Sequence, residues 1–144
     1  GDLAAHLTRL AHSKSNLNFY GSVQHSEIPG KLRDFEIGLL PMPNLPVWAI
    51  SSPLKRSEYI STGLLVLGIN HTGHLLPSTS DDHEWYRLFD QQSFVDDSIE
   101  QIQRWIGEDN FSELSRNARQ YAESELSWEI TTQSFVELIE NLER

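Results

Sequence analysis

The longest apolar run limits the fold of this chain more than any other feature of its 144 residues. It extends from Gly63 to Ile69, and its centre, Leu64 to Leu67, is almost entirely aliphatic. The run is far shorter than the ~20 residues of a membrane span, and it has no polar side to face water. It therefore predicts a central β-strand buried on both faces, as in a parallel sheet covered by helices.

Helical and extended patterns alternate along the rest of the chain. We expect helices over residues 2–12, 26–35 and 51–62, strands over 17–20, 36–40, 64–67 and 85–89, and helices from 95 almost to the end. This order predicts an α/β fold with a Rossmann-like parallel sheet. Residues 1–94 would form the sheet portion and residues 95–144 the C-terminal helices of a single domain. Such a sheet usually begins with a strand, whereas this chain opens in a helix, so we expect a partial domain truncated at its N-terminus.

Three apolar stripes follow one another in the helical tail. They are Ile99, Ile102 and Ile106; Leu114, Ala118, Tyr121 and Ala122; and Trp128, Phe135, Leu138, Ile139 and Leu142. Stripes at this spacing are typical of helices that pack on a core. We expect the tryptophans and the last stripe to be core residues.

The composition excludes several classes of function. The net charge of -10 argues against nucleic acid or an anionic membrane as a direct partner. The absence of cysteine excludes disulfides and thiolate metal sites, and it favours a cytoplasmic protein. His71, His74, Asp81, Asp82 and His83 crowd one polar loop, but their spacing matches no defined metal motif, so we expect no metal.

The segment from Ser51 to Gly63 contains the most informative chemistry. Ser52 is a good N-cap and Pro53 a good first helical residue, which puts Lys55 at the third helical position with Arg56 after it. Cations beside the positive end of a helix dipole make sense where an anion such as a diphosphate docks. The alternative is two solvated surface cations without a partner.

Glu58 lies about one turn deeper in the same predicted helix. A carboxylate there could accept hydrogen bonds from two adjacent sugar hydroxyls, as acidic residues do for ribose in dinucleotide sites. The alternative is an exposed glutamate or one paired with a neighbouring arginine.

The order strand, proline, loop, Ser-Pro-Leu-Lys-x-x-Glu-Tyr, glycine and aliphatic strand resembles the C-terminal half of GT-B glycosyltransferases, especially the large retaining group called family 4. The resemblance covers most of the chain at low identity. It includes the strand that ends at Gly21, the pair Glu36-Ile37, and the pair Ser127-Trp128 in the closing helices.

The resemblance implies the donor-binding part of an enzyme that transfers a sugar, of hexosyltransferase type, from a nucleoside-diphosphate sugar to an unknown acceptor. Glu58 would take the second glutamate position of the family's Glu-x7-Glu motif and bind the donor's ribose hydroxyls. Ser51, Ser52, Leu54 and Lys55 would face the diphosphate or sugar. No cofactor and no catalytic residue is assigned. The acceptor-binding N-terminal domain would be a partner in the same enzyme, and this part alone would be inactive.

The chain departs from the family pattern at two positions. Ile50 stands where the first glutamate of the motif would fall, and Leu65 replaces the proline of the usual Gly-x-Pro-Val. Three alternatives therefore remain: a non-catalytic or degenerate GT-B domain, a GT-B nucleotide-sugar epimerase, and an unrelated α/β interaction domain.

Overall fold

A computed structural model describes residues 3–51, 53–77 and 82–142 of the chain. The chain forms two compact units, Gly1–Lys31 and Leu32–Arg144. Within the described residues, no helix is both long enough and apolar enough to cross a membrane.

The first unit holds helix α1, Ala4–Ser13, the 3₁₀ turn η1, His25–Glu27, and the start of helix α2, Ile28–Leu32. Helices α1 and α2 confirm the helices predicted over residues 2–12 and 26–35. The expected N-cap Ser26 lies inside η1, and Gln24 caps this turn instead through a reciprocal pair of contacts with Glu27.

The strand predicted over residues 17–20 is wrong. This segment has no regular secondary structure and its four residues are exposed. A strand is stable only when its backbone groups pair with a neighbour, and Leu17 and Phe19 alternate with polar residues without such a neighbour in this unit. The described chain therefore has three strands instead of the four expected.

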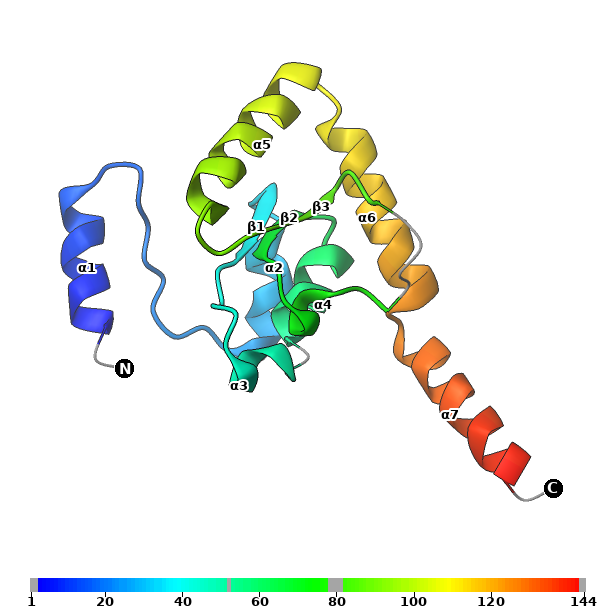
Figure 1. Ribbon diagram of the computed structural model, residues 1–144. Helices are drawn as coiled ribbons and strands as arrows, with labels where there is room; N and C mark the ends of the chain where they lie inside the picture. The colour runs from blue at the N-terminus through cyan, green and yellow to red at the C-terminus, as the bar shows by residue number, and fades with distance from the viewer. Residues whose placement is uncertain (1–2, 52, 78–81, 143–144) are drawn as a thin grey trace. The chain divides into compact units, whose positions relative to one another are not determined.

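The second unit is built on a parallel sheet of β1, Ile37–Leu40, β2, Leu65–Ile69, and β3, Tyr86–Phe89, in the order β1-β2-β3 (Figure 1). Every residue of β2 is buried, as the aliphatic run predicts. The α/β class with a Rossmann-like parallel sheet is thus confirmed.

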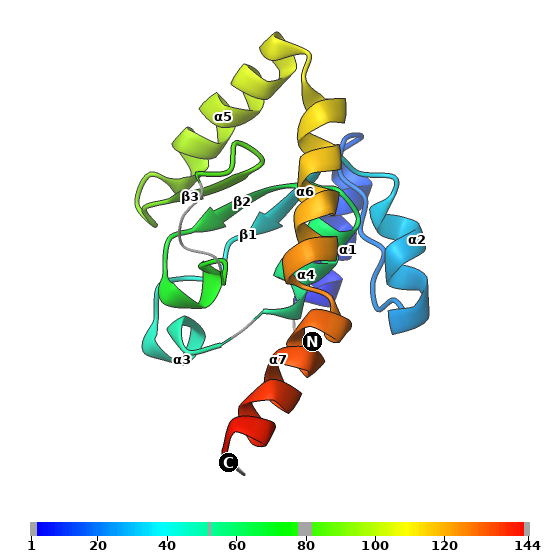
Figure 2. The same cartoon turned by 90° about the vertical axis from the view of Figure 1, so that its right-hand side faces the viewer.

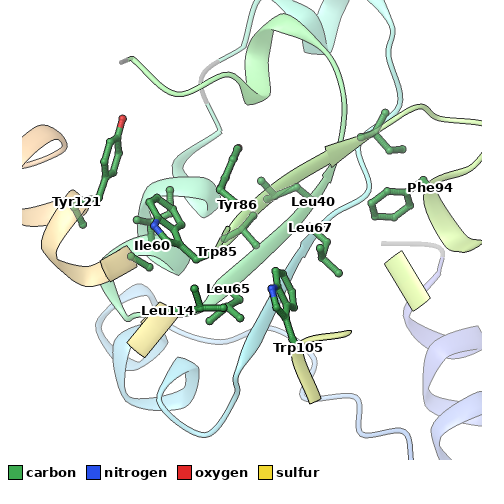
Figure 3. Packing of buried hydrophobic residues seen from close by; sticks show 14 residues of the cluster. Leu40, Ile60, Leu65, Leu67, Trp85, Tyr86, Phe94, Trp105, Leu114 and Tyr121 are labelled. Carbon is green, nitrogen blue, oxygen red and sulfur yellow. The ribbon is translucent and has the colours of Figure 1, made fainter. Parts of the chain in front are cut away.

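Helices cover the two faces of this sheet. Helix α5, Phe94–Glu108, contacts β2 and β3 (Figure 2). Helix α4, Leu54–Ser61, contacts β1 and β2, and α6, Phe111–Glu125, packs against α4 and β2. The core between these layers includes the residues labelled in Figure 3. Trp105 of α5 is its largest fully buried side chain.

Helix α5 buries the predicted stripe of isoleucines only in part, because Ile102 is half-buried against the core and a neighbouring face provides the fully buried residues. Phe94, Ser98, Gln101 and Trp105 are its buried residues, while Ile99 and Ile106 are 51% and 66% exposed. The apolar arc of α5 is wider than the sheet surface it covers, and the larger Trp105 occupies the contact. The stripe predicted on α6 is confirmed, because Leu114, Ala118, Tyr121 and Ala122 are all buried.

Helix α7, Trp128–Leu142, does not bury the stripe expected to be core. Trp128 is 79% exposed, and Phe135 and Leu138 are also exposed. Of the four tryptophans, Trp85 and Trp105 are core residues as expected, whereas Trp48 and Trp128 are exposed. A heptad-like apolar pattern specifies that a helix can pack, but it does not supply the surface to pack on.

Gly38 sets the approach of α4 to the sheet. A Cβ atom at this position of β1 would lie 2.6 Å from Cγ of Tyr59, far inside van der Waals contact. We expect Gly38→Ala to lower the free energy of unfolding by about 1–3 kcal/mol, the usual cost of overpacking. Urea unfolding followed by circular dichroism measures the change.

Gly107 of α5 provides the matched control for Gly38. A Cβ atom there meets nothing within 4 Å, so Gly107→Ala should leave stability unchanged or raise it by up to about 1 kcal/mol through helix propensity. Equal destabilisation by both substitutions would contradict the packing argument.

Candidate functional site

The connections that follow the three strands meet at the carboxyl edge of the sheet. The chain after β1 forms the one-turn helix α3, Pro46–Ala49, and the chain after β2 forms the 3₁₀ turn η2, Thr72–His74. The backbone N–H of Asn44, after β1, donates to Oε1 of Gln91, after β3, at 2.8 Å. In parallel α/β sheets, ligands bind at this edge, so it is the first place to search for a site.

The first two connections are joined closely through backbone carbonyls. Thr72 Oγ1 donates to the Ala49 carbonyl at 2.6 Å. A Cβ atom on Gly73 would lie 2.5 Å from the Trp48 carbonyl oxygen and 2.6 Å from that of Ser51. Only glycine fits here, so the segment that leads into α4 is held directly against η2.

Arg56 of α4 fixes this arrangement from inside. Its side chain is 7% exposed, and Nη1 donates to the carbonyls of Gly73 and Leu75 at 3.2 and 2.5 Å. Arg56 is therefore not a solvated surface cation, nor is its guanidinium turned to the solvent to meet an anion. It satisfies carbonyl groups of the connection after β2, and its Nε has no hydrogen-bond partner.

Two histidines complete the buried polar cluster beside Arg56. His74 Nδ1 lies 2.7 Å from the Ile69 carbonyl, which can only accept, so Nδ1 bears the proton. His71 Nδ1 accepts from the backbone N–H of Gly73, so its proton is on Nε2. The two rings lie 3.8 Å apart, and both Nε2 atoms are buried without a hydrogen-bond partner.

Burial lowers the pKa of His74, and the neighbouring His71 and Arg56 lower it further, against the opposing effect of the Ile69 hydrogen bond. The Tyr86 hydroxyl donates to the His74 carbonyl at 2.5 Å, and burial raises the pKa of this tyrosine. The cluster therefore places a histidine of lowered pKa beside one permanent positive charge.

Of the residues predicted to bind a donor, Leu54, Lys55 and Glu58 lie on α4, and Ser51 precedes this helix. Helix α4 begins at Leu54, and Pro53 has the extended backbone of an N-cap, so Lys55 is the second helical residue and Arg56 the third. Ser52, expected to be the N-cap, lies outside the described residues. The prediction that Lys55 is the third helical residue is therefore wrong by one position.

The side chains of these residues differ in their surroundings. Leu54 and Lys55 are exposed, and Glu58 is half-buried one turn deeper. Ser51 is also half-buried, and its Oγ donates to the Trp48 carbonyl at 2.7 Å. Lys55 and the N–H groups at the start of α4 can meet an anion from solvent, while the Glu58 carboxylate can accept hydrogen bonds.

The distribution of charged residues in this part of the sequence is unusual, and motifs considered one at a time do not reveal it. Between Glu36 and Asp81 the chain has one acidic residue, Glu58, although it has 21 in all. The same stretch contains Lys55, Arg56, His71 and His74. The stretch that joins β1 to β3 is therefore poor in acids within an acidic protein.

A separate cleft of about 400 Å³ lies at the other end of β3. Residues 82 to 85 and α6 line it, with Asn117 and Gln120 among the polar side chains. The His83 ring stacks on Trp85 with 4.6 Å between centroids. This cleft contains none of the predicted donor-binding residues. Within the described ranges, no cluster of three metal-binding side chains exists, there or elsewhere.

No protein-family model, no curated protein and no solved structure matches this chain. The functional argument therefore rests on the residues and on the geometry described above.

Neighbouring cations at the start of α4 have different roles, which substitution can separate. Arg56→Gln should lower the free energy of unfolding by about 2–3 kcal/mol, because it leaves buried carbonyls without their charged donor. Lys55→Gln should change it by less than about 0.5 kcal/mol, as for other exposed side chains. Urea unfolding of both variants tests this, and equal effects would refute the assignment of Arg56 to the framework.

The buried His74 should make stability depend on pH. The folded protein binds this proton less readily than the unfolded chain, because the pKa of His74 is lowered on folding. Stability is therefore complete above the unfolded pKa of about 6.5 and falls as the pH drops below it. Urea unfolding between about pH 7.5 and pH 5.5 should show a shallower loss for His74→Asn than for the unchanged protein. Equal slopes for the two proteins would contradict this role of His74.

Proposed function

We propose that this chain is the donor-binding portion of a glycosyltransferase, with the start of α4 as the site for a nucleoside-diphosphate sugar. The observation that favours this function is that one carboxylate and two cations lie together on α4, Leu54–Ser61. Glu58 is the one acidic residue between Glu36 and Asp81, and Lys55 is exposed one turn before it.

The two halves of a nucleoside-diphosphate sugar need opposite chemistry. The diphosphate needs donors and positive charge, which Lys55 and the first N–H groups of α4 supply. The ribose needs an acceptor for two adjacent hydroxyls, which the Glu58 carboxylate supplies. Further carboxylates in this segment would repel the diphosphate, so a segment with Glu58 as its one acid between Glu36 and Asp81 suits this ligand.

In sugar transfer, these residues would position the donor and stabilise negative charge. As the bond between sugar and diphosphate breaks, negative charge grows on the leaving diphosphate. Lys55 and the dipole of α4 would stabilise that charge without a proton transfer. Arg56 would act indirectly, because its bonds to Gly73 and Leu75 hold the start of α4 against η2.

One observation favours the second candidate, a degenerate domain that binds a donor without catalysis. Ile50, at the position of the family's first glutamate, is 89% exposed and has no polar group for a donor hydroxyl. Binding would then survive where transfer does not. Measuring release of nucleoside diphosphate by the enzyme that includes the acceptor-binding domain, beside binding itself, distinguishes the two.

A ligand-observed NMR titration of the chain with UDP, GDP and ADP tests the proposal. We expect one nucleotide to bind and Glu58→Ala to weaken it about tenfold or more, since hydrogen bonds to a charged group contribute about 1.5–3 kcal/mol. Lys55→Gln should weaken binding by a smaller factor and reduce its dependence on salt. Glu113→Gln, an exposed acid on α6, is the matched control.

Two outcomes would contradict the proposal. The first is binding that Glu58→Ala and Glu113→Gln affect equally, which would place the nucleotide elsewhere. The second is the absence of binding for all three nucleotides and for their sugar conjugates. Circular dichroism of each variant shows whether a lost signal reflects unfolding instead of a lost contact.

A further inference from the structure

The turn η2 is held by side chains through three consecutive carbonyl groups. Arg56 Nη1 donates to the carbonyls of Gly73 and Leu75 at 3.2 and 2.5 Å. The Tyr86 hydroxyl donates to the carbonyl between them, that of His74, at 2.5 Å. Donors from α4 and β3 therefore fix the turn from two sides.

The side chain of His74 is enclosed in the same cluster, at 0% exposure. Its Nδ1 donates to the Ile69 carbonyl, so a second proton can bind only at Nε2. Nε2 is buried, and no group among the described residues forms a hydrogen bond with it. A proton at Nε2 would therefore create a buried cation without an acceptor, which is a costly state.

The ionisable groups around His74 do not favour a second positive charge. Burial is the main cause of its lowered pKa, and His71 from the same connection and Arg56 from α4 lower the pKa further. Tyr86 from β3 stays uncharged, because burial raises its pKa. The strand β2, which leads into this connection, and α3, which contacts η2, contain no ionisable side chain. No carboxylate of the described residues is among the groups that shift the pKa of His74.

The turn η2 in its place holds the segment that leads into α4. Thr72 Oγ1 donates to the Ala49 carbonyl. The backbone of Gly73 lies directly against the carbonyl of Trp48. Movement of η2 would release this segment and expose the guanidinium of Arg56. The pairing between the strands does not use residues of η2, so the sheet can stay intact.

We propose that η2 is a pH-sensitive switch, in which protonation of His74 releases the turn from Arg56 and Tyr86 and frees the segment that leads into α4. In the closed state, His74 holds one proton, on Nδ1. In the open state, its Nε2 reaches water and takes up a second proton, so acid favours the open state. Only hydrogen bonds change between the two states. The switch involves no ligand, so it stands independently of nucleotide binding.

The uptake of one proton sets the size of the effect. In the open state, a histidine in water titrates at the ordinary pKa of about 6.5. The equilibrium constant for opening is then nearly constant above about pH 7.5 and rises up to about tenfold per pH unit below about pH 6. Between about pH 7.5 and pH 5.0, the total rise is up to about thirtyfold.

Hydrogen exchange of the chain, followed by NMR between about pH 7.5 and pH 5.0, tests the inference. The amides of His74 and Leu75 bond within the turn, so their protection, corrected for the intrinsic exchange rate, measures the opening of η2. We expect this protection to fall by up to about thirtyfold with acid and to be insensitive to low urea concentrations. The Leu65 and Val66 amides bond across the sheet, so they should keep a higher, urea-sensitive protection at every pH.

Two variants separate the proton from a simple loosening of the turn. His74→Asn keeps a side-chain N–H for the Ile69 carbonyl but cannot take up a proton, so the protection of the Leu75 amide should no longer depend on pH. Thr72→Val is the matched control, because it removes the hydrogen bond to the Ala49 carbonyl without changing an ionisable group. It should lower the protection of η2 by a similar factor at every pH and leave the dependence on pH in place.

Three results would overturn the inference. One is a protection of η2 that does not change with pH, or that changes equally in a folded His74→Asn variant. Another is a protection that matches that of Leu65 and Val66 in size and urea dependence, because His74 would then become accessible only on global unfolding. The third is a change that begins near about pH 4 instead of about pH 6.5, which would assign the proton to a carboxylate. This last measurement needs no variant, so it decides the inference even where His74→Asn does not fold.

Discussion

Complete burial of β2 is the constraint on which the rest of the second unit depends. A strand without a polar face needs a neighbour on each edge and a layer of side chains on each face. Strands β1 and β3 supply the edges, while α5 on one face and α4 with α6 on the other supply the layers. Because all three strands are parallel, their carboxyl ends lie at one edge, where the connections to the following elements must gather.

Much of this could be predicted from the sequence, because the decisive patterns are local. The aliphatic run of β2 has one structural explanation, and proline and glycine mark the ends of the elements around it. The segment from 17 to 20 shows the limit of such patterns. Its short apolar run suits a strand, but a strand also needs a partner, and the sequence of the segment does not contain that information.

The errors in the helical tail have a related cause. The isoleucines of α5 have the spacing of a buried stripe, yet Trp105 occupies the sheet surface, because the direction a helix faces depends on what it meets. For α7, periodicity predicted the helix correctly and its burial wrongly. At the candidate site, the sequence placed Lys55 and Glu58 on one helix. It did not reveal that Arg56, between them, turns inward to carbonyls of a connection 17 and 19 residues away.

The chemistry of the buried cluster limits what the carboxyl edge can bind. A buried guanidinium usually has a carboxylate partner, which would cancel its charge. Arg56 Nη1 donates to two backbone carbonyls instead, which do not neutralise its charge, and its Nε has no hydrogen-bond partner. Burial is the main cause of the lowered pKa of His74, and the charge of Arg56 beside it lowers the pKa further. A positive charge retained beneath the start of α4 adds to the helix dipole there. An anion that approaches Lys55 therefore meets a positive potential to which both Arg56 and Lys55 contribute, with Glu58 as the single carboxylate in the sequence between Glu36 and Asp81.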